Sequence, residues 1–410
     1  MTNILLLTGA FSPCPHSASQ RVTSFARAFS AKGFDVSVVT SSRCLKKRSG
    51  ALLKNVQVYD FNCPRVFFSI SAIIVNPFLL LLYLSMSMII GIRKRVDVVL
   101  ASVPNGETAI AGFLLSKIFR SLLVIDVRDI YPPPTVELPF HALHTPEKLD
   151  AVLIGLFQLL YKLSDKVICV DANIKDELIA SGVSPQNAFI IPNGADVHLY
   201  RPIDSEKQRI IRLEKGLPLE GFIFVYAGAL TPWYPLDGAI EGASRVFSRR
   251  KDFHLLIIGH TRHAPYEKLA SELDLENCVR FLGPLPEDET AEILSACDAG
   301  LVVYHGEDYW KTMYGSKIFS YMSCGLPILA AGPPGSVIED IILKHDAGLF
   351  VGKPTADSFE KGFSCFLNDI RKIQGMGKNA RKAAEKFYDR EKLGLGLASS
   401  IESWVTQEIR

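Results

Sequence analysis

Short apolar segments alternate with helical stretches along the whole chain, and this alternation restricts the possible fold more than any other feature. The first helical stretch places Val22, Phe25, Ala26 and Phe29 at helical spacing, and Gly33 closes it. The strands predicted in this half are Ile4-Leu7, Asp35-Thr40, Val56-Phe61, Asp97-Ala101, Leu122-Asp126, Lys166-Val170 and Ala188-Ile191. Strands that alternate with helices form parallel sheets covered on both faces. This half is therefore predicted to be a doubly wound domain.

The second half of the chain repeats the same pattern. Its predicted strands are Phe222-Tyr226, His254-Ile258, Val279-Leu282, Ala299-Val303, Pro327-Ala330 and Gly348-Val351. The fold class is therefore predicted to be α/β, with two doubly wound, Rossmann-like domains. Ligands on such sheets bind beyond the carboxyl ends of the strands. With two domains facing each other, we expect the ligand site in a cleft between the sheets.

The predicted domain limits follow from this repeat. Residues 1–200 form the first domain and residues 201–388 the second, with a hinge at Asn193 and Gly194. The last helical stretch, residues 389–410, is predicted to cross back to the first domain. The start of the chain, Asn3 to Gly9, has no basic residue before it and is predicted to be a buried strand rather than a secretory signal.

Composition excludes several classes of protein. Of the 410 residues 48% are hydrophobic and 21% are charged, which is enough apolar material for a large core. The formal net charge of +2 is too balanced to indicate a nucleic-acid partner. The eight cysteines are scattered, without a CxxC pair or a zinc-like Cys/His spacing. We expect them to be reduced thiols packed as small apolar residues.

A run without charged residues, Val66 to Ile92, raises the question of a membrane span. Within it, Asn76-Pro77 has the pattern of an N-cap with proline at the first helical position. The helix predicted to follow, Pro77 to Ile92, is roughly 24 Å long at 1.5 Å per residue, short for a hydrocarbon core of about 30 Å. We expect residues 66–95 to contact an anionic membrane surface peripherally (monotopic), with Arg93-Lys94-Arg95 near the headgroups. The alternative is a helix buried under the sheet.

The stretch "GSKIFSYMSCGLPILA" has the residue types of an anion site. Gly315 allows the backbone to approach a ligand, Ser316 precedes a short helix, and Lys317 adds a full charge. An ordinary helix cap explains Ser316 but not Lys317. Three predicted strands of the same half end in glycine turns, at Gly228, Gly259 and Gly283, where a ligand of a parallel sheet would lie. Each glycine alone is more often a turn residue.

The first half offers two further loops at strand ends. "GAFSPCPHSASQR", Gly9 to Arg21, is rich in small residues and opens a helix, so it is a candidate phosphate loop with His16, Ser17, Ser19 and Arg21. "DVRDIYPPP", Asp126 to Pro134, presents Arg128 and Asp129. The alternative for these two residues is a structural ion pair.

Together these segments resemble the retaining, nucleotide-sugar-dependent glycosyltransferases of the group 1 type (family 4), which have the GT-B fold. The motifs that carry the resemblance occur in the family's order and are "SDKVICVDANIKDELIASGV", "IIPNGADVHLYRP", "VYAGAL", "LLIIGH", "VRFLGPLPEDE", "ILSACDAGLVV" and "GSKIFSYMSCGLPILA". "RDIYP" and "GSKIF" are most similar to enzymes that build bacterial surface polysaccharides such as lipopolysaccharide on lipid carriers, including amino-sugar transferases.

The resemblance implies a function and a set of roles. The chain would be a hexosyl- or other glycosyltransferase at the cytoplasmic face of the inner or plasma membrane, acting on a nucleotide-sugar, expected to be a UDP-sugar, and a polyprenyl-linked or glycan acceptor. The donor-binding residues would be Gly228, Gly259, Gly283, Leu285, Gly315, Ser316, Lys317 and Ser320. Asp129 and Arg128 would orient acceptor and sugar, and Lys317 would neutralise the leaving diphosphate. No DxD carboxylate pair calls for Mg²⁺, so no metal or other cofactor is expected.

The chain also departs from the family's pattern. Two glutamates usually flank the Lys317 motif, at positions that hold Thr312 and Ser320 here. The second usually binds the ribose, a role left to Ser320, Tyr321 or Asp308. "LTPWYP" lacks the usual basic residue, and Ser17-Ala18-Ser19 replaces paired glycines. An unusual donor, help from Arg21 or Arg128, and lost activity are all compatible with these changes.

Two rival functions follow from these observations. One is a catalytically silent homologue that acts as a binding or scaffold subunit. The other is a nicotinamide-dependent oxidoreductase, which the lack of a G-x-G-x-x-G motif after the first strand argues against.

Overall fold

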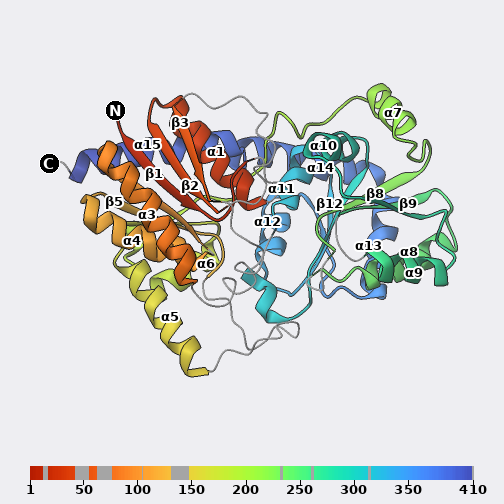
Figure 1. The fold of residues 1–410 in the computed structure, drawn as a ribbon. Coiled ribbons are helices and arrows are strands. Elements are labelled where there is room, and N and C mark those ends of the chain that lie inside the picture. Colours follow the sequence, from red (N-terminus) through yellow and green to blue (C-terminus); the bar gives the residue numbers. More distant parts are fainter. Residues whose placement is uncertain are drawn as a thin grey trace. The chain divides into compact units, whose positions relative to one another are not determined.

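The computed structural model describes residues 1–12, 17–41, 55–61, 76–103, 105–130, 147–230, 234–259, 263–312 and 315–408. They divide into two compact units (Figure 1). The first contains Met1–Pro192 and Glu391–Arg410, and the second contains Asn193–Arg390. The boundary near the predicted hinge thus falls after Pro192, a few residues before the predicted end of the first domain at residue 200.

The first unit is built on a sheet of seven strands, in the order β3-β2-β1-β4-β5-β6-β7. The strands are β1 (Asn3–Thr8), β2 (Asp35–Thr40), β3 (Val56–Asp60), β4 (Val98–Val103), β5 (Leu122–Val127), β6 (Lys166–Cys169) and β7 (Ala188–Ile190). All neighbouring pairs are parallel. The predicted strands of this half are confirmed, with ends that shift by one or two residues. β1 lies near the middle and is almost wholly buried, as its continuous apolar sequence requires.

Helices cover this sheet. They are α1 (Ser17–Ala31), α3 (Pro77–Arg93), α4 (Gly106–Phe119), α5 (Glu147–Lys162), α6 (Ala172–Ala180), the short 3₁₀ helix η1 (Pro185–Asn187) and α15 (Arg390–Glu408). α15 comes from the end of the chain and packs against α1, where a Cβ at Gly394 would lie 2.9 Å from that of Ala28. Its Trp404 ring lies 4.9 Å from that of Phe189. The first unit is therefore completed by a segment that follows the second unit in the sequence.

Helix α3 begins as its sequence predicts. The side chain of Asn76 accepts hydrogen bonds from the backbone N–H groups of Phe78 and Leu79, and Pro77 is the first helical residue. On its inner side, the hydroxyl of Tyr83 donates to the carbonyl of Thr8 at 2.8 Å. Within the described residues, no helix has the length and apolar character to cross a membrane. The first part of the uncharged run, residues 66–75, lies outside the described residues.

The second unit has a sheet of six strands in the order β10-β9-β8-β11-β12-β13. They are β8 (Phe222–Ala227), β9 (Phe253–Ile258), β10 (Val279–Gly283), β11 (Ala299–Val303), β12 (Ile328–Ala331) and β13 (Gly348–Phe350), and all pairs are parallel. This confirms the predicted strands of the second half. Because the strands are parallel, the turns that follow β8, β9, β10 and β11 meet at one edge of the sheet.

The helices of the second unit are α7 (Ser205–Glu214), α8 (Asp237–Phe247), α9 (His263–Glu272), α10 (Glu287–Ser295), η2 (Asp308–Thr312), α11 (Lys317–Ser323), α12 (Val337–His345), α13 (Ala356–Asn368) and α14 (Ile370–Phe387). α8 and α13 pack closely, because Gly242 leaves room for Phe359. The aromatic centre of the core is Phe224 of β8, whose ring lies 4.8 Å from that of Phe363 and 5.2 Å from that of Phe366. This core fixes the position of β8, the strand that Gly228 follows.

Candidate functional site

Three glycines lie side by side at the carboxyl edge of the second sheet. The N–H of Gly259 donates to the carbonyl of Gly283 at 3.0 Å, and the N–H of Gly228 donates to the carbonyl of Ile258 at 2.9 Å. A Cβ at Gly259 would lie 2.0 Å from the carbonyl oxygen of Gly228, so a side chain does not fit there. Gly283 has φ +68°, a conformation that favours glycine. The structure thus joins three of the predicted donor-binding residues into one backbone surface.

Lys317 is the first residue of α11, and its side chain reaches this surface. Its ammonium nitrogen lies 3.0 Å from the hydroxyl oxygen of Tyr226. It also lies 4.2 Å from the ring centre of Tyr226, 4.0 Å from that of Tyr234 and 5.9 Å from that of Tyr304. A Cβ at Gly228 would be 3.0 Å from this nitrogen. Among the described residues, no carboxylate forms an ion pair with Lys317.

The charge of Lys317 is poorly solvated. The side chain is partly exposed as a whole, but its ammonium end lies among the three rings. Burial lowers the pKa of Lys317 to about 7, and no charged neighbour contributes to the shift. A lysine with this environment gains most from an anionic ligand, because the ligand supplies the missing counter-charge.

Tyrosine hydroxyl groups connect Lys317 to the surrounding turns. The hydroxyl of Tyr226 donates to the carbonyl of Ala229 at 2.8 Å. The hydroxyl of Tyr304 accepts the N–H of Gly315, and that of Tyr321 accepts the N–H of Ala227 at 2.7 Å. Sequence reasoning missed Tyr226, Tyr234 and Tyr304 as site residues. The available signal was the position of Tyr226 and Tyr304 at the carboxyl ends of two neighbouring strands.

The other predicted donor residues have less direct roles in the structure. Ser316 precedes α11 without a capping hydrogen bond from its side chain. The hydroxyl of Ser320 bonds to that of Tyr200, which is buried. Leu285 is half-buried in the segment that follows Gly283. Lys317 and the glycine turns are therefore the groups of this edge that are best placed for a ligand.

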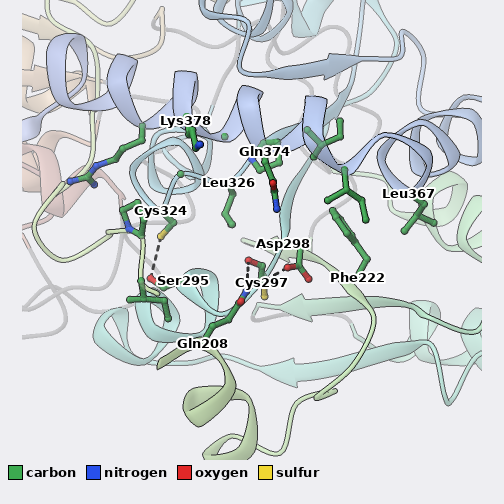
Figure 2. Close-up of a pocket in the computed structure, with 18 of the residues that line it drawn as sticks. Gln208, Phe222, Ser295, Cys297, Asp298, Cys324, Leu326, Leu367, Gln374 and Lys378 are labelled. Atoms are coloured by element: carbon green, nitrogen blue, oxygen red, sulfur yellow. Dashed lines mark hydrogen bonds between the residues drawn. The ribbon is translucent and has the colours of Figure 1, made fainter. Parts of the chain in front are cut away.

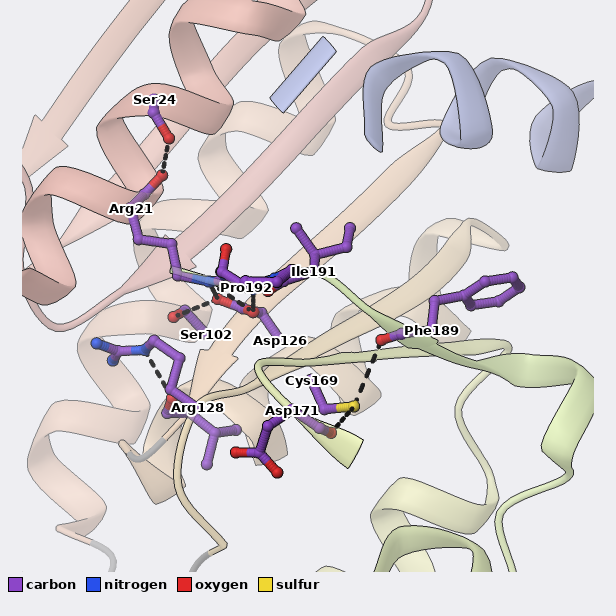
Figure 3. Close-up of polar contacts among 11 residues, drawn as sticks. Arg21, Ser24, Ser102, Asp126, Arg128, Cys169, Asp171, Phe189, Ile191 and Pro192 are labelled. Atoms are coloured by element: carbon purple, nitrogen blue, oxygen red, sulfur yellow. Dashed lines mark hydrogen bonds and ion pairs between the residues drawn. The ribbon is translucent and has the colours of Figure 1, made fainter. Parts of the chain in front are cut away.

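In the first unit, Arg21 is buried in an ion pair with Asp126 (Figure 3). The two side chains are 2% and 0% exposed, and their closest N–O distance is 2.8 Å. The guanidinium also donates to the carbonyls of Ile191 and Pro192, at 2.8 Å and 2.9 Å. These bonds join α1, β5 and the segment after β7. Contrary to the predicted phosphate contact, Arg21 serves the core of this unit and is poorly placed to reach a ligand.

The remaining residues of the predicted phosphate loop do not form a site among the described residues. Ser19 is buried within α1. Ser17 is the first residue of α1, but its side chain is outside the described part of the chain, and so is the whole of His16.

Arg128 and Asp129 follow β5 at the carboxyl edge of the first sheet. The guanidinium of Arg128 donates to the carbonyl of Val103 at 3.0 Å, and Asp129 is exposed. Figure 3 shows Asp171 on the same side of the sheet as Arg128. Asp171 caps α6 by accepting the N–H of Ile174 at 2.8 Å, while its second oxygen has no partner among the described residues. Burial, together with the charge of Asp129, raises the pKa of Asp171 to about 6.

A pocket of about 920 Å³ lies at the other end of the second sheet (Figure 2). Phe222 and Pro327, which line it, stand at the amino ends of β8 and β12. Several polar groups in its wall already bond within the protein. Asp298 pairs with Arg212 at 2.8 Å, and Arg250 pairs with Asp252 at 2.8 Å. This pocket is therefore separate from the site around Lys317.

The predicted hinge residues, Asn193 and Gly194, begin the second unit. Gly194 has φ +59°, and its carbonyl accepts a hydrogen bond from Arg390 at 3.1 Å. Ala195 and Asp389 form a parallel bridge. The two ends of the second unit are thus fastened to each other. No group of three or more metal-binding side chains occurs in the described parts of the chain.

Two family models match the chain in succession. The model for Glycosyltransferase Family 4 matches residues 18–199, and the model for Glycosyl transferases group 1 matches residues 207–383. The second match includes the glycine turns and Lys317.

Relatives of the chain in other bacteria are also named as glycosyltransferases. The chain is 27% identical over 250 residues to a D-inositol 3-phosphate glycosyltransferase of Corynebacterium aurimucosum, an alignment that covers 59% of this chain and 58% of that protein. It is 26% identical over 250 residues to the protein of the same name from Corynebacterium glutamicum, with the same coverage. The chain thus aligns with less than two thirds of these relatives.

Solved structures match over nearly the whole chain. HepE of Anabaena in complex with UDP has a TM-score of 0.72 at 18% identity, with 98% of this chain and 100% of that chain covered. Sucrose-phosphate synthase of Thermosynechococcus elongatus has a TM-score of 0.77 at 16% identity, with 99% and 100% covered. At these identities the likeness concerns the fold, and it confirms the predicted α/β class with two Rossmann-like units. The chain therefore belongs to the group 1 glycosyltransferases and has the GT-B fold.

Proposed function

We propose that the protein is a retaining glycosyltransferase that moves a sugar from a UDP-sugar to a lipid-linked or glycan acceptor in surface polysaccharide synthesis. The observation that carries this proposal is the ammonium of Lys317, which lies beside Gly228 without a carboxylate partner among the described residues. A diphosphate at this edge would place its charge next to Lys317 and its oxygens close to the backbone of the glycine turns. The structures of HepE with UDP and with UDP-glucose support the choice of donor.

The same residues suggest how the reaction proceeds. The bond between the sugar carbon and the diphosphate oxygen breaks, and a bond to the acceptor oxygen forms on the same face of the sugar. The proton of the acceptor hydroxyl passes to the leaving diphosphate. Lys317 stabilises the negative charge that develops on that group, because a preorganised cation in a poorly solvated site acts strongly on it. Since Lys317 supplies a positive charge that can offset the charge of the leaving group, we propose that the reaction is independent of a metal or other cofactor.

The acceptor would bind at the carboxyl edge of the first sheet. Arg128 is held there by the carbonyl of Val103, and Asp129 is exposed. A carboxylate accepts hydrogen bonds from sugar hydroxyl groups, and a fixed guanidinium binds a phosphate. We propose that these two residues orient the acceptor, as the family resemblance suggests.

We further propose that the protein binds peripherally to the cytoplasmic face of an anionic membrane through helices α3, α4 and α5. These helices lie side by side in the first unit (Figure 1). Large apolar side chains, each between 38% and 80% exposed, form what we call the α3–α5 face: Phe78, Leu81, Ile89 and Ile92, Leu114 and Ile118, and Val152, Ile154, Leu156 and Leu159. Exposed apolar area of this kind favours an interaction surface.

Charge on these helices favours an anionic lipid surface as the partner. Arg93, Lys117, Arg120 and Lys162 are exposed at the C-terminal ends of α3, α4 and α5. Helices that connect parallel strands run in one direction, so these cations gather along one side of the α3–α5 face. The described side chains of the three helices include one carboxylate, Glu107, and it is buried. Of the predicted basic triplet, Lys94 pairs with Asp35 and is mostly covered, whereas Arg95 pairs with Asp97 and its side chain remains 76% exposed.

Purified protein tests the proposed reaction. Thermal unfolding should shift upward with UDP or another nucleoside diphosphate, and a matching nucleotide-sugar should be hydrolysed slowly or transferred when acceptor is added. The departures from the family at Thr312 and Ser320 favour one rival, the silent binding subunit. That rival predicts nucleotide binding without any turnover. A protein that binds no nucleoside diphosphate would contradict both.

A further inference from the structure

We propose that Tyr226 and Tyr304 are positioning residues of this site, which hold the ammonium of Lys317 and the backbone of Gly315 where a diphosphate would bind. This inference rests on the proposed function, because it assigns roles around the same ligand. We assign neither tyrosine a contact with the reacting atoms. Each acts through another residue.

The hydrogen bonds of Tyr226 orient the ammonium group of Lys317. A tyrosine hydroxyl has a single proton, and here it is donated to the carbonyl of Ala229 at 2.8 Å. The lone pairs of the oxygen are thereby left for the ammonium of Lys317 at 3.0 Å. Tyr226 is fully buried, and burial raises the pKa of its phenol well above the usual value, so it stays neutral and keeps this proton. One buried group thus fixes both the lysine and the turn that contains Gly228.

Tyr304 fixes the other side of the site. Its hydroxyl accepts the N–H of Gly315, two residues before Lys317. Its ring packs edge-to-face on that of Tyr234, with ring centres 5.1 Å apart. The ring centre of Tyr234 in turn lies 4.0 Å from the ammonium nitrogen of Lys317. Tyr304 is 2% exposed, so the segment that leads into α11 is anchored to the core. The start of α11 is therefore set by tertiary contacts rather than by a helix cap.

Phenols suit this task better than a carboxylate would. Aromatic rings and neutral hydroxyl groups attract an ammonium but leave its charge uncompensated. A carboxylate would form an ion pair, which an incoming diphosphate would have to break. Among the described residues on β8, on the turn before α8 and after β11, the titratable groups that face Lys317 are Tyr226, Tyr234 and Tyr304. The site thus keeps an oriented cation for a diphosphate, which is more acidic than any of the three phenols.

The test compares single hydroxyl deletions, Tyr226→Phe and Tyr304→Phe, with wild type and Lys317→Ala. The probe is UDP, or whichever of GDP and ADP stabilises the wild type more. Tyr388→Phe is the matched control, because Tyr388 is also a buried tyrosine of the second unit, but its hydroxyl bonds to His345 at 2.9 Å. Calorimetry gives the affinity at several pH values, and thermal unfolding shows that each variant is folded.

We expect Tyr226→Phe to weaken nucleotide binding about tenfold, the lower range for a hydrogen bond to a charged group. The pH profile should move as well. Only the charged form of Lys317 binds the anion, so affinity falls above its pKa, and removal of an acceptor for the ammonium lowers that pKa further. The fall in affinity should therefore begin at lower pH in Tyr226→Phe. Tyr304→Phe should weaken binding without this displacement, and Tyr388→Phe should match wild type.

The outcomes separate this inference from the proposed function. Loss of binding in Lys317→Ala with wild-type affinity and pH profile in both Tyr226→Phe and Tyr304→Phe overturns the inference and leaves the function standing. Wild-type binding in Lys317→Ala overturns the proposed diphosphate site, and the inference with it. If Tyr226→Phe does not fold, Tyr304→Phe carries the test, since unchanged affinity there contradicts the anchoring of Gly315.

Discussion

The ammonium nitrogen of Lys317 and the hydroxyl oxygen of Tyr226 lie 3.0 Å apart, and the same nitrogen lies 4.2 Å from the centre of the tyrosine ring. These two residues are separated by 91 positions in the sequence. The contact brings a charge from the start of α11 to the glycine turn after β8. It therefore gives the second unit a cation at the carboxyl edge of its sheet, where we propose that a nucleotide binds.

Lys317→Ala should reduce both nucleotide affinity and turnover while the fold stays intact. Loss of one charge-assisted contact to a phosphate costs about 1.5–3 kcal/mol. Calorimetry with UDP and steady-state kinetics measure the effect. Lys268→Ala is the control, because Lys268 forms only an exposed pair with Glu272 on α9. Unchanged kinetics in Lys317→Ala would remove this lysine from the site.

The stability of the wild type should depend on pH through Lys317. The pKa of this lysine is lowered to about 7 in the folded protein, against about 10.4 in an unfolded chain. Between these values the unfolded chain binds more protons, so this lysine makes the free energy of unfolding rise with pH across that interval. Lys317→Met removes the dependence. In urea denaturation the variant should be more stable than wild type below pH 7, and its advantage should shrink as the pH rises toward 10.

Arg21→Met should destabilise the first unit strongly. The change leaves Asp126 as an unpaired charge with 0% exposure, and breaking a buried pair in this way costs about 3–5 kcal/mol. The double variant Arg21→Met/Asp126→Leu should recover part of the loss. Lys32→Met is the control, because the pair of Lys32 with Glu402 is largely exposed and is worth roughly 0–1 kcal/mol. A stable Arg21→Met protein with lost nucleotide affinity would restore the predicted phosphate role.

Membrane binding should depend on the α3–α5 face. Leu81→Glu and Ile92→Glu place carboxylates at positions that are 61% and 80% exposed, where contact with an anionic lipid surface would repel and desolvate them. In flotation with vesicles that contain phosphatidylglycerol, wild type should float at low salt and the double variant should stay at the bottom. Ile210→Glu, at an exposed apolar position of α7, should behave as wild type. Equal flotation of all three proteins would show that this face does not bind lipid.

The sequence predicted the sheets and the glycine turns because these features are local. A parallel strand that ends in glycine can be read from one segment, and the edge of the sheet then brings such segments together. The tyrosine cluster could not be read in this way. Tyr226, Tyr234 and Tyr304 come from three separate segments, and a tyrosine at the end of a buried strand is typical of any core. Arg21 was assigned to a ligand because its partner, Asp126, lies 105 positions away.

Ser320→Glu tests how this site differs from its family. Family resemblance places a ribose-binding glutamate at this position, where the structure has a hydroxyl bonded to that of Tyr200. A glutamate would break this bond beside a buried tyrosine, so some loss of stability is expected. If its carboxylate reaches the ribose hydroxyls, UDP should bind more tightly by about 1.5–3 kcal/mol, the range for a hydrogen bond to a charged group.

The sign of the change in UDP affinity for Ser320→Glu is the informative result, and Ser320→Gln separates shape from charge. Tighter binding in the glutamate variant alone would mean that the site is a weakened form of the family's ribose contact. Weaker binding in the glutamate variant, with wild-type affinity in Ser320→Gln, would mean that another acid such as Asp308 already holds the ribose, because two carboxylates there repel each other. Equal affinity in wild type and both variants, for UDP, GDP and ADP, would show that Ser320 does not face the donor. The contact with Tyr200 would then be its whole role.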